Sequence, residues 1–457
     1  MGAIWQMSAT ALLAGYASGR LSPVDAMEAV LARIDAVNPA LNAFFVVRAD
    51  EAIQAARDSE ARWHAKAPIG ALDGVPVSIK DSIAMVGWPY WRGTKGRVGT
   101  VSGQDSPPAA RLREAGAIFF GKTTMPDYGL LGSGVSSAHG TTRNPWNLAM
   151  NTGGSSSGAG AAVASGMGPA AIGSDLAGSV RLPASHCGIF ALKPSQGAVP
   201  HTPPSSTRVA GPMTRTVADA ALLMSVLSKP DEASHGSGAS LPASIAPADV
   251  RGLRIGLLMG QGFGDEVEAG VAELVHRAAD LFRQAGAAVG EMRDPIRPEL
   301  LDDFRSVFTV KAAMERDELP PPVRALTLDC ISAVCDEGDG VSAKRFLRAM
   351  EGIEKAKAVY RDASVPFDFI LSPVMPVAGF AAEAVGPQAD MPLRHLSFTA
   401  ITNQLGWPAA SICCGFTAEG LPVGLQIAGS MGTDADILAL AAWYEQARGF
   451  DPGFPVI

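Results

Sequence analysis

Apolar residues recur with a helical period in the first part of the chain, and a short apolar run follows them. Residues 22–25 (SPVD) have the form of a capping box with proline at the first helical position. Apolar side chains then recur every three or four residues until Asn38-Pro39, where we expect the helix to stop. A second helix is predicted from about residue 50 to 65. The run Val75–Lys80 predicts a strand with Lys80 at its end.

The remaining chain continues to alternate between helical and strand patterns. Helices are predicted at 109–115, at 265–285 and through most of 293–363. Strands are predicted at 117–120, 170–173, 253–259, 287–292, 369–372 and 421–428. No internal repeat interrupts the series. This alternation predicts an α/β protein whose sheet is covered by helices on both faces.

Two segments have the composition of linkers. Residues 151–183 are dominated by Gly, Ser and Ala, which is typical of flexible linkers. Their near lack of charge, and a run of small residues at 159–164 that suits a closely packed helix, favour a buried segment instead. Residues 229–250 are polar and rich in Ser and Pro, and they predict a true linker or surface excursion.

Composition narrows the class of protein. Apolar residues make up 47% of the 457 residues and charged residues 18%, with a formal net charge of −8. This balance predicts a globular enzyme and gives no basic surface for nucleic acid. The five scattered cysteines predict neither disulfides nor a zinc site. Apolar runs are too short for a membrane span, and no signal peptide precedes them, so we expect a cytoplasmic protein.

The first candidate for chemistry is Ser179. An apolar strand at 170–173 leads into a turn of small residues that ends at this serine. Such a turn can leave successive backbone N–H groups pointing one way, which suits an oxyanion site beside a nucleophile. An ordinary Gly/Ser turn is the alternative.

A serine nucleophile needs a base, and two choices are open. Residues 154–158 match the G-x-S-x-G elbow of histidine-dependent hydrolases, with Ser156 as nucleophile. That motif needs a preceding strand, and 147–152 is a poor one. Lys80 is the other base, provided that burial keeps its amine neutral. Its alternative is an ordinary lysine that pairs with Asp81 or reaches water.

Several motifs in order resemble one family. The resemblance to the amidase signature family rests on GGSSSGAG at 153–160, DLAGSVRLP at 175–183, GIFALKP at 188–194, GVPVSIKD at 74–81, GKTTMP at 121–126, GTTRNPW at 140–146, GPMTRTVAD at 211–219 and GLPVGLQ at 420–426. It spans residues 1–457 and is weakest from Lys229 to about Phe367. It implies one large mixed sheet covered by helices on both faces, with a variable, mostly helical substrate segment at about 229–400.

The resemblance also implies the catalytic residues. The family's lysine falls on Lys80, its bridging serine, which follows a cis peptide bond, on Ser155, and its nucleophile on Ser179. The backbone N–H groups of Leu176, Ala177, Gly178 and Ser179 would form the oxyanion hole. Ala177 stands where the family usually has a glycine, and we expect the hole to survive this change unless φ must be positive there. No metal or organic cofactor is implied.

The resemblance implies hydrolysis of a carbonyl C–N bond in a small molecule. An amide or anilide, an aryl carbamate (a urethane) and, as a side activity, an ester would each fit. We expect the loop with Tyr128, Gly129 and Ser133 to bind substrate, helped by apolar residues that either line a cleft or belong to the core: Phe304, Phe308, Met314, Phe346 and Met350. Alternatives are an ammonia-supplying glutaminase subunit of a transamidation complex and an inactive scaffold protein. We expect a monomer or homodimer.

Overall fold

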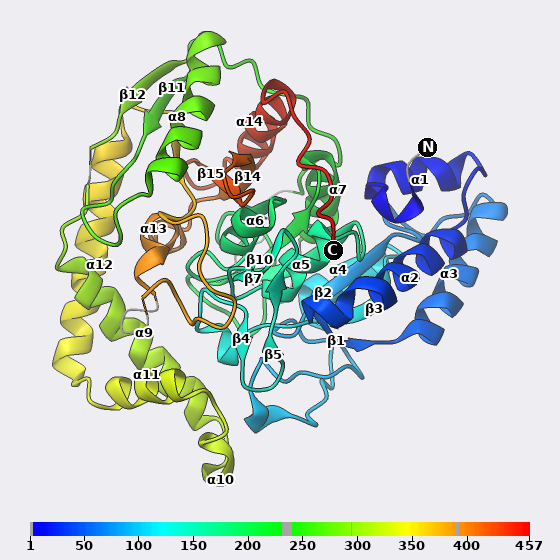
Figure 1. The fold of residues 1–457 in the computed structure, drawn as a ribbon, viewed down its shortest axis with the longest axis horizontal. Helices are drawn as coiled ribbons and strands as arrows, with labels where there is room; N and C mark the ends of the chain where they lie inside the picture. Colours follow the sequence, from blue (N-terminus) through cyan, green and yellow to red (C-terminus); the bar gives the residue numbers. More distant parts are fainter. Residues whose placement is uncertain (1–2, 231–239, 294, 389–392) are drawn as a thin grey trace.

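One mixed sheet runs through the protein. The computed structural model describes residues 3–230, 240–293, 295–388 and 393–457. The sheet has eleven strands, and β2 and β8 are parallel neighbours in it. Figure 1 shows β2 and β3 near the N-terminal helices and β11 and β12 at the far side of the molecule. In spatial order the strands are β1 (Phe44–Val47), β3 (Ile118–Thr123), β2 (Pro76–Lys80), β8 (Ala170–Asp175), β10 (Val209–Thr214), β9 (Phe190–Lys193), β14 (Ala409–Phe416), β15 (Pro422–Ala428), β13 (Phe369–Pro373), β11 (Arg254–Leu257) and β12 (Ala288–Glu291).

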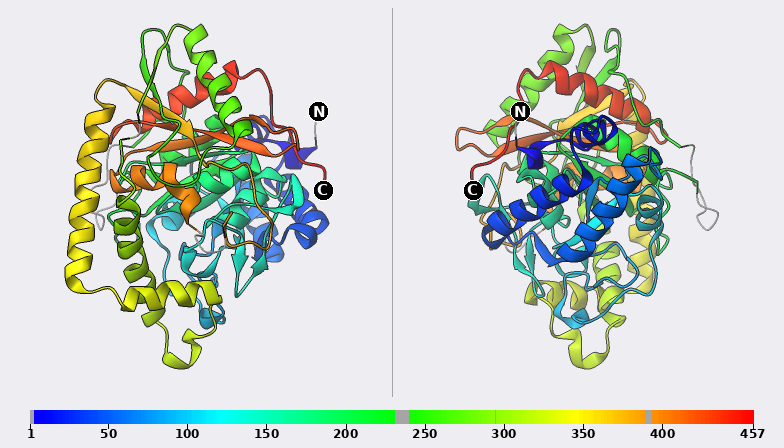
Figure 2. Two further views of the ribbon diagram at one scale, coloured as in Figure 1. Left: turned by 60° about the vertical axis from the view of Figure 1, so that its left-hand side comes forward. Right: turned by 90° about the vertical axis from the view of Figure 1, so that its right-hand side faces the viewer.

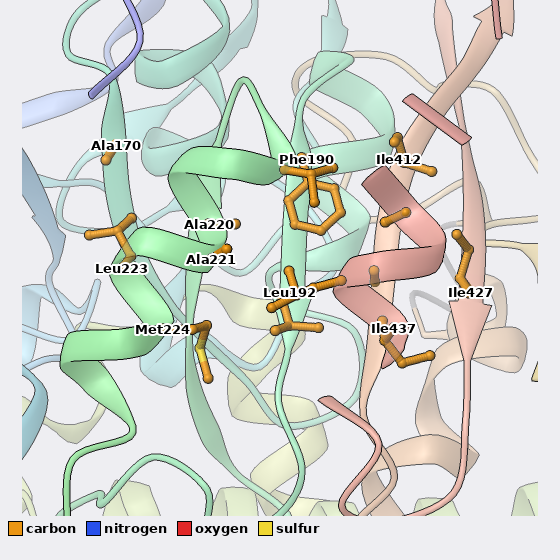
Figure 3. Packing of buried hydrophobic residues seen from close by; sticks show 14 of the residues in the cluster. Ala170, Phe190, Leu192, Ala220, Ala221, Leu223, Met224, Ile412, Ile427 and Ile437 are labelled. Carbon is orange, nitrogen blue, oxygen red and sulfur yellow. The ribbon is translucent and has the colours of Figure 1, made fainter. Parts of the chain in front are cut away.

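Alternate residues of the central strands belong to different cores, because side chains along a strand point to opposite faces. In β8, Ala170 and Ile172 pack into the largest cluster while Ala171 faces a second cluster. Phe190 and Leu192 of β9 likewise lie in the largest cluster (Figure 3). The helices of that first face are α1 (Ala9–Ala17), α4 (Pro107–Glu114), α7 (Val217–Leu227), α8 (Ala269–Gln284) and α14 (Asp434–Ala447).

The opposite face is covered by two groups of helices (Figure 2). Beside β1, β3 and β8 lie α2 (Pro23–Leu41), α3 (Ala49–His64), α5 (Ser157–Ala164) and α6 (Arg181–Cys187). Near β13 and β15 lie α9 (Leu300–Asp317), α12 (Ala343–Ser364) and α13 (Ser397–Gln404). The short α10 (Pro321–Arg324) and α11 (Asp329–Asp339) extend this second group. The predicted α/β fold with helices on both faces of one mixed sheet is therefore confirmed.

Three details differ from the sequence-based predictions. Helix α2 continues past Pro39 to Leu41, since a proline in the last turn removes only one backbone hydrogen bond. Just beyond the helix end, Asn38 Oδ1 accepts the backbone N–H groups of Ala43 and Phe44. Helix α8 begins at Ala269 rather than near residue 265. The segment 147–152 contains a strand, β7 (Asn147–Asn151), which pairs with β6 (Arg143–Asn144) outside the main sheet.

The Gly- and Ser-rich segment is part of the core. Helix α5 is buried along its whole length, as its small residues predicted. A Cβ at Gly158 would lie 2.2 Å from the carbonyl oxygen of Ala43, so only glycine allows this close approach. Of the predicted linker at 229–250, residues 231–239 lie outside the described part, and 240–250 contain no helix or strand.

Candidate active site

Three segments that are far apart in the sequence meet beside the end of β2. Strands β2 and β8 are parallel neighbours, so their carboxyl ends meet at one edge. Lys80 is the last residue of β2, and β8 leads through Ser179 into α6. Ser155 lies in the segment that enters α5. Lys80 is completely buried, and Ser155 is 3% exposed.

Hydroxyl groups surround the amine of Lys80. Its Nζ lies 2.8 Å from Ser155 Oγ and 2.9 Å from Ser156 Oγ. It also lies 3.1 Å from Ser174 Oγ and 3.3 Å from the Ser174 carbonyl oxygen. No carboxylate bonds to Lys80 Nζ among the residues that the structure describes. Because a neutral amine can take a proton from a hydroxyl, this arrangement suits a base.

Asp81 has other partners. Its carboxylate accepts the backbone N–H groups of Trp91 and Gly93, each at 2.8 Å, and lies 3.1 Å from His139 Nε2. Burial alone would raise the pKa of Asp81, but its bonds and the charges around it hold that pKa below its usual range. The alternative that Lys80 pairs with Asp81 or reaches water is therefore wrong.

The electrostatics around Lys80 favour its neutral form. Burial lowers the pKa of Lys80 well below its ordinary value, and the positive charges of Arg208 and Arg92 lower it further. The carboxylates of Asp175 and Asp81 act in the opposite direction and are outweighed. The lysine that ends β2 therefore loses its proton more readily than an ordinary lysine, as a general base must.

Asp175 fixes the turn that carries Ser179. Its carboxylate accepts the N–H of Gly178 at 2.7 Å and that of Val180 at 3.2 Å. Arg181 donates to both of its oxygens at 3.0 Å, and both side chains are fully buried. Burial alone would raise the pKa of Asp175, but Arg181 holds it well below the usual range. A charged buried pair therefore sets the backbone on both sides of Ser179.

The proposed oxyanion turn needs glycine at one position only. Gly178 has φ of 126°, and a Cβ there would lie 2.4 Å from Thr399 Oγ1. Ala177 is not among the residues with positive φ, so its side chain causes no backbone conflict. Thr399 Oγ1 donates to the Ala177 carbonyl oxygen at 2.5 Å. The Gly178 N–H already bonds to Asp175, so it is not available to an oxyanion as the sequence analysis expected.

Ser155 is held between two glycines. The Gly154–Ser155 peptide bond is cis, as the family resemblance implies. A Cβ at Gly154 would lie 2.3 Å from the carbonyl oxygen of Ser133, and one at Gly129 would lie 3.1 Å from Ser155 Oγ. Ser133 is fully buried and lies behind Gly154 rather than in the cavity lining, contrary to its expected contact with substrate.

The alternative nucleophile Ser156 has no histidine partner. Its Oγ contacts Lys80 Nζ and lies 3.4 Å from the Ser174 carbonyl oxygen. Within the described ranges, no hydrogen bond joins Ser156 to a histidine. His139, the histidine that precedes this motif in the sequence, lies 3.1 Å from Asp81 instead. The geometry therefore does not support a Ser156–His hydrolase.

A cavity of about 270 Å³ opens beside these serines. Ser155, Ser179, Tyr128 and Gly129 contribute to its wall. A second cavity of about 180 Å³ shares Leu176, Phe308 and Lys311 with the first, so the two adjoin. Its wall is largely apolar and includes Ala177, Phe263, Phe304, Val307, Leu393 and Leu396. The site can thus hold a small molecule that has an apolar part.

The apolar residues that we singled out divide into two groups. Phe304, Phe308 and Met314 line the cavities. Phe346 packs against a core cluster, and Met350 is exposed, so neither lines a cavity. The sequence analysis missed a set of charged wall residues, namely Arg92, Arg208, Lys311 and Glu315. Lys311 and Glu315 follow Phe304 and Phe308 at helical spacing, which was a usable signal.

The family is established by comparison with known proteins. The Amidase family model matches residues 25–438. An acylamidase from Rhodococcus erythropolis is 34% identical over 97% of this chain and 95% of the relative. A glutamyl-tRNA(Gln) amidotransferase subunit from Symbiobacterium thermophilum is 34% identical over 99% of each chain. A crystal structure of a bacterial aryl acylamidase of the amidase signature family superposes with a TM-score of 0.91 at 28% identity, covering 98% of this chain and 99% of that one.

The fold and the sequence together define a hydrolase of carbon–nitrogen bonds. The chain belongs to the amidase signature family. Among the described helices, none combines the length and apolar character needed to cross a membrane. The same part of the chain contains no group of three or more His, Cys, Asp or Glu residues arranged to hold a metal ion.

Proposed function

We propose that the protein hydrolyses small amides through an acyl-enzyme on Ser179, with Ser155 as proton bridge and Lys80 as base. The observation that carries this proposal is the buried amine of Lys80, which contacts Ser155 Oγ at 2.8 Å and has no carboxylate partner in the described chain. Ser155 and Ser179 line one cavity, so a carbonyl carbon there can reach the nucleophile. A scaffold protein would have no need for a buried lysine whose pKa is lowered and whose amine contacts two serine hydroxyls.

The reaction has two halves. Ser179 Oγ attacks the carbonyl carbon while its proton passes to Ser155, and the proton of Ser155 passes to Lys80. The N–H groups of Leu176, Ala177 and Ser179 stabilise the negative oxygen of the tetrahedral intermediate. The C–N bond then breaks, and the nitrogen leaves with the proton that Lys80 returns. Water attacks the resulting ester by the same route and regenerates Ser179.

The second cavity favours an apolar substituent on the substrate. Phe304, Phe308 and Leu176 offer contact to an aliphatic or aromatic group beside the oxyanion turn. Anilides and aryl amides fit this description, and the carbonyl of an aryl carbamate or ester could occupy the same position. Free glutamine, the substrate of an ammonia-supplying subunit, has no apolar group for this cavity. We therefore place acyl anilides first among candidate substrates.

Hydrolysis of matched substrates tests the proposal. We would assay an acyl anilide, a primary amide, an aryl carbamate, an ester and glutamine with the wild-type protein, Ser179→Ala and Lys80→Met. Ser430→Ala, an exposed serine outside the cavities, is the control. We expect anilide hydrolysis that Ser179→Ala abolishes and the control retains. Hydrolysis of glutamine alone would support the subunit role, and no reaction with a fluorophosphonate would support a scaffold.

A further inference from the structure

One face of α9 forms a common wall for both cavities. Phe304, Phe308, Lys311 and Glu315 follow one another at intervals of three or four residues, so they share a face of the helix. Phe304 lines the second cavity, Glu315 lines the first, and Phe308 and Lys311 line both. These four side chains therefore change from apolar to charged along one face of the helix, with Lys311 at the change. Asp302 and Arg305 of the same helix line the second cavity beside Phe304.

Positive charge is in excess at the charged end. Arg92, only 5% exposed, bonds to both carboxylate oxygens of Glu315. Arg208 Nη2 lies 3.3 Å from Glu315 Oε1. Glu318, the other acidic residue that is described in the lining of the first cavity, is paired with Arg97. Glu315 thus balances one of two arginines, and one guanidinium charge is left over before Lys311 is counted.

Lys311 adds a second uncompensated charge. Its side chain is partly buried, and no residue in the described part of the chain forms an ion pair or hydrogen bond with it. Burial and the nearby charge of Arg208 both lower the pKa of Lys311, and no carboxylate of the described residues acts against them. A cation without a partner in a cavity wall is costly unless a ligand supplies the counter-charge.

We propose that this wall recognises a carboxylate on the substrate, with Lys311 and Arg208 as its binding residues. The substrate class is then a small amide that carries both an apolar part, which packs against Phe304 and Phe308, and an anionic group near Lys311. A carboxylate matches the geometry because its two oxygens can accept from an ammonium and a guanidinium together. This inference rests on the proposed hydrolysis and names the substrate that the same site selects.

Two isosteric pairs of substrates test the inference. On the amine side, 4-acetamidobenzoate is compared with 4-nitroacetanilide, because the nitro group has the shape of a carboxylate without its charge. On the acyl side, the monoanilide of succinate is compared with 4-methylpentananilide, whose isopropyl group has about the shape of the carboxylate. Intrinsic reactivities differ within a pair, but they cancel when the ratio of kcat/KM values is compared between variants.

The decisive variant is Lys311→Met, which keeps the length of the side chain and removes the charge. The exposed Lys344 of α12 provides the control Lys344→Met. We expect Lys311→Met to lower the charged-to-neutral ratio of kcat/KM by about ten- to a hundredfold for at least one pair, the range for a bond to a charged group. Lys311→Arg should retain most of the preference. Added salt should lower the ratio in the wild type and in the control but not in Lys311→Met.

Binding to the inactive Ser179→Ala protein separates recognition from catalysis. Calorimetry should show tighter binding of the carboxylate of one pair than of its neutral partner, and Lys311→Met should remove the difference. Neutral anilides hydrolysed with an unchanged ratio in Lys311→Met would overturn the inference and leave the proposed function standing. Selective carboxylate binding without hydrolysis of any anilide would overturn the proposed function and leave the recognition standing.

Discussion

Replacing Asp175 by asparagine should weaken both the fold and the active site. The substitution preserves the shape of the side chain but removes the only carboxylate that pairs with Arg181 in the described structure. Asp175 Oδ1 accepts from Gly178, Arg181 and Asn403, and Oδ2 accepts from Val180 and Arg181. An amide offers only one oxygen in place of two. The N–H groups that now bond to the other oxygen would face the NH2 group of asparagine, which is itself a donor.

The expected loss follows from burial. Both members of the pair are completely buried, and a broken buried pair typically costs about 3–5 kcal/mol because the remaining charge is uncompensated. Such a loss is a large share of the roughly 5–15 kcal/mol that stabilises a folded protein. The turn at Gly178 would also lose its anchor, so kcat should fall more than KM rises.

Chemical denaturation measures the effect on stability, and anilide hydrolysis measures the effect on kcat. The matched control is Asp434→Asn, a buried aspartate that accepts the Ser195 N–H at 2.7 Å and has no ion pair among the described residues. The control should lose about 1 kcal/mol of its free energy of unfolding, the usual net value of one hydrogen bond. If Asp175→Asn lost no more free energy of unfolding than this control and kept its kcat, the role that we give to the pair would be refuted.

Three further changes have equally definite outcomes. Activity on anilides should rise with pH through the lowered pKa of Lys80 and then level off, because only the neutral amine accepts a proton. Lys80→Ala should lose more activity on anilides than on activated esters, whose leaving groups need no proton. Equal losses on the two substrates would show that Lys80 has a structural role. Burial lowers the pKa of His186 to about 3 and that of His395 to about 4, so the unfolded chain binds protons at these two histidines at a higher pH than the folded protein does. The free energy of unfolding should therefore fall as pH drops from about 6.5 toward 4, and it should fall less steeply in His395→Gln. Identical slopes of this free energy against pH in the two proteins would contradict the prediction. Gly178→Ala should reduce kcat because its Cβ would meet Thr399, and unchanged kcat would argue against a fixed turn.

Much of the fold could be predicted because local patterns and tertiary packing agree. The apolar run that ends at Lys80 and the one at 170–173 are both buried strands. The helix was expected to stop at Asn38-Pro39, but it ends two residues after Pro39, since a proline in the last turn has little effect. The strand at 147–151 was underestimated because it forms a small exposed hairpin in which apolar alternation has no role.

The site was only partly predictable for a physical reason. The motifs singled out Lys80, Ser155 and Ser179 as candidates, since each lies in a distinctive local sequence. The structure brings Lys80 and Ser155 into contact and places Ser155 and Ser179 in the wall of one cavity. Ser174 lies at the end of β8, and its contact with Lys80 depends on strands β2 and β8 being neighbours, which the sequence pattern does not reveal. The charged wall joins residues as far apart as Arg92 and Lys311, so only the tertiary fold brings them together.

The most direct test of the account is the position of the covalent intermediate. The protein would be mixed with an activated ester or a fluorophosphonate, quenched in acid, digested and analysed by mass spectrometry. The account predicts one modified residue, Ser179, with labelling lost in Ser179→Ala and greatly slowed in Lys80→Met. An adduct on Ser155, on Ser156 or on a histidine, or labelling that proceeds unchanged without Ser179, would contradict it.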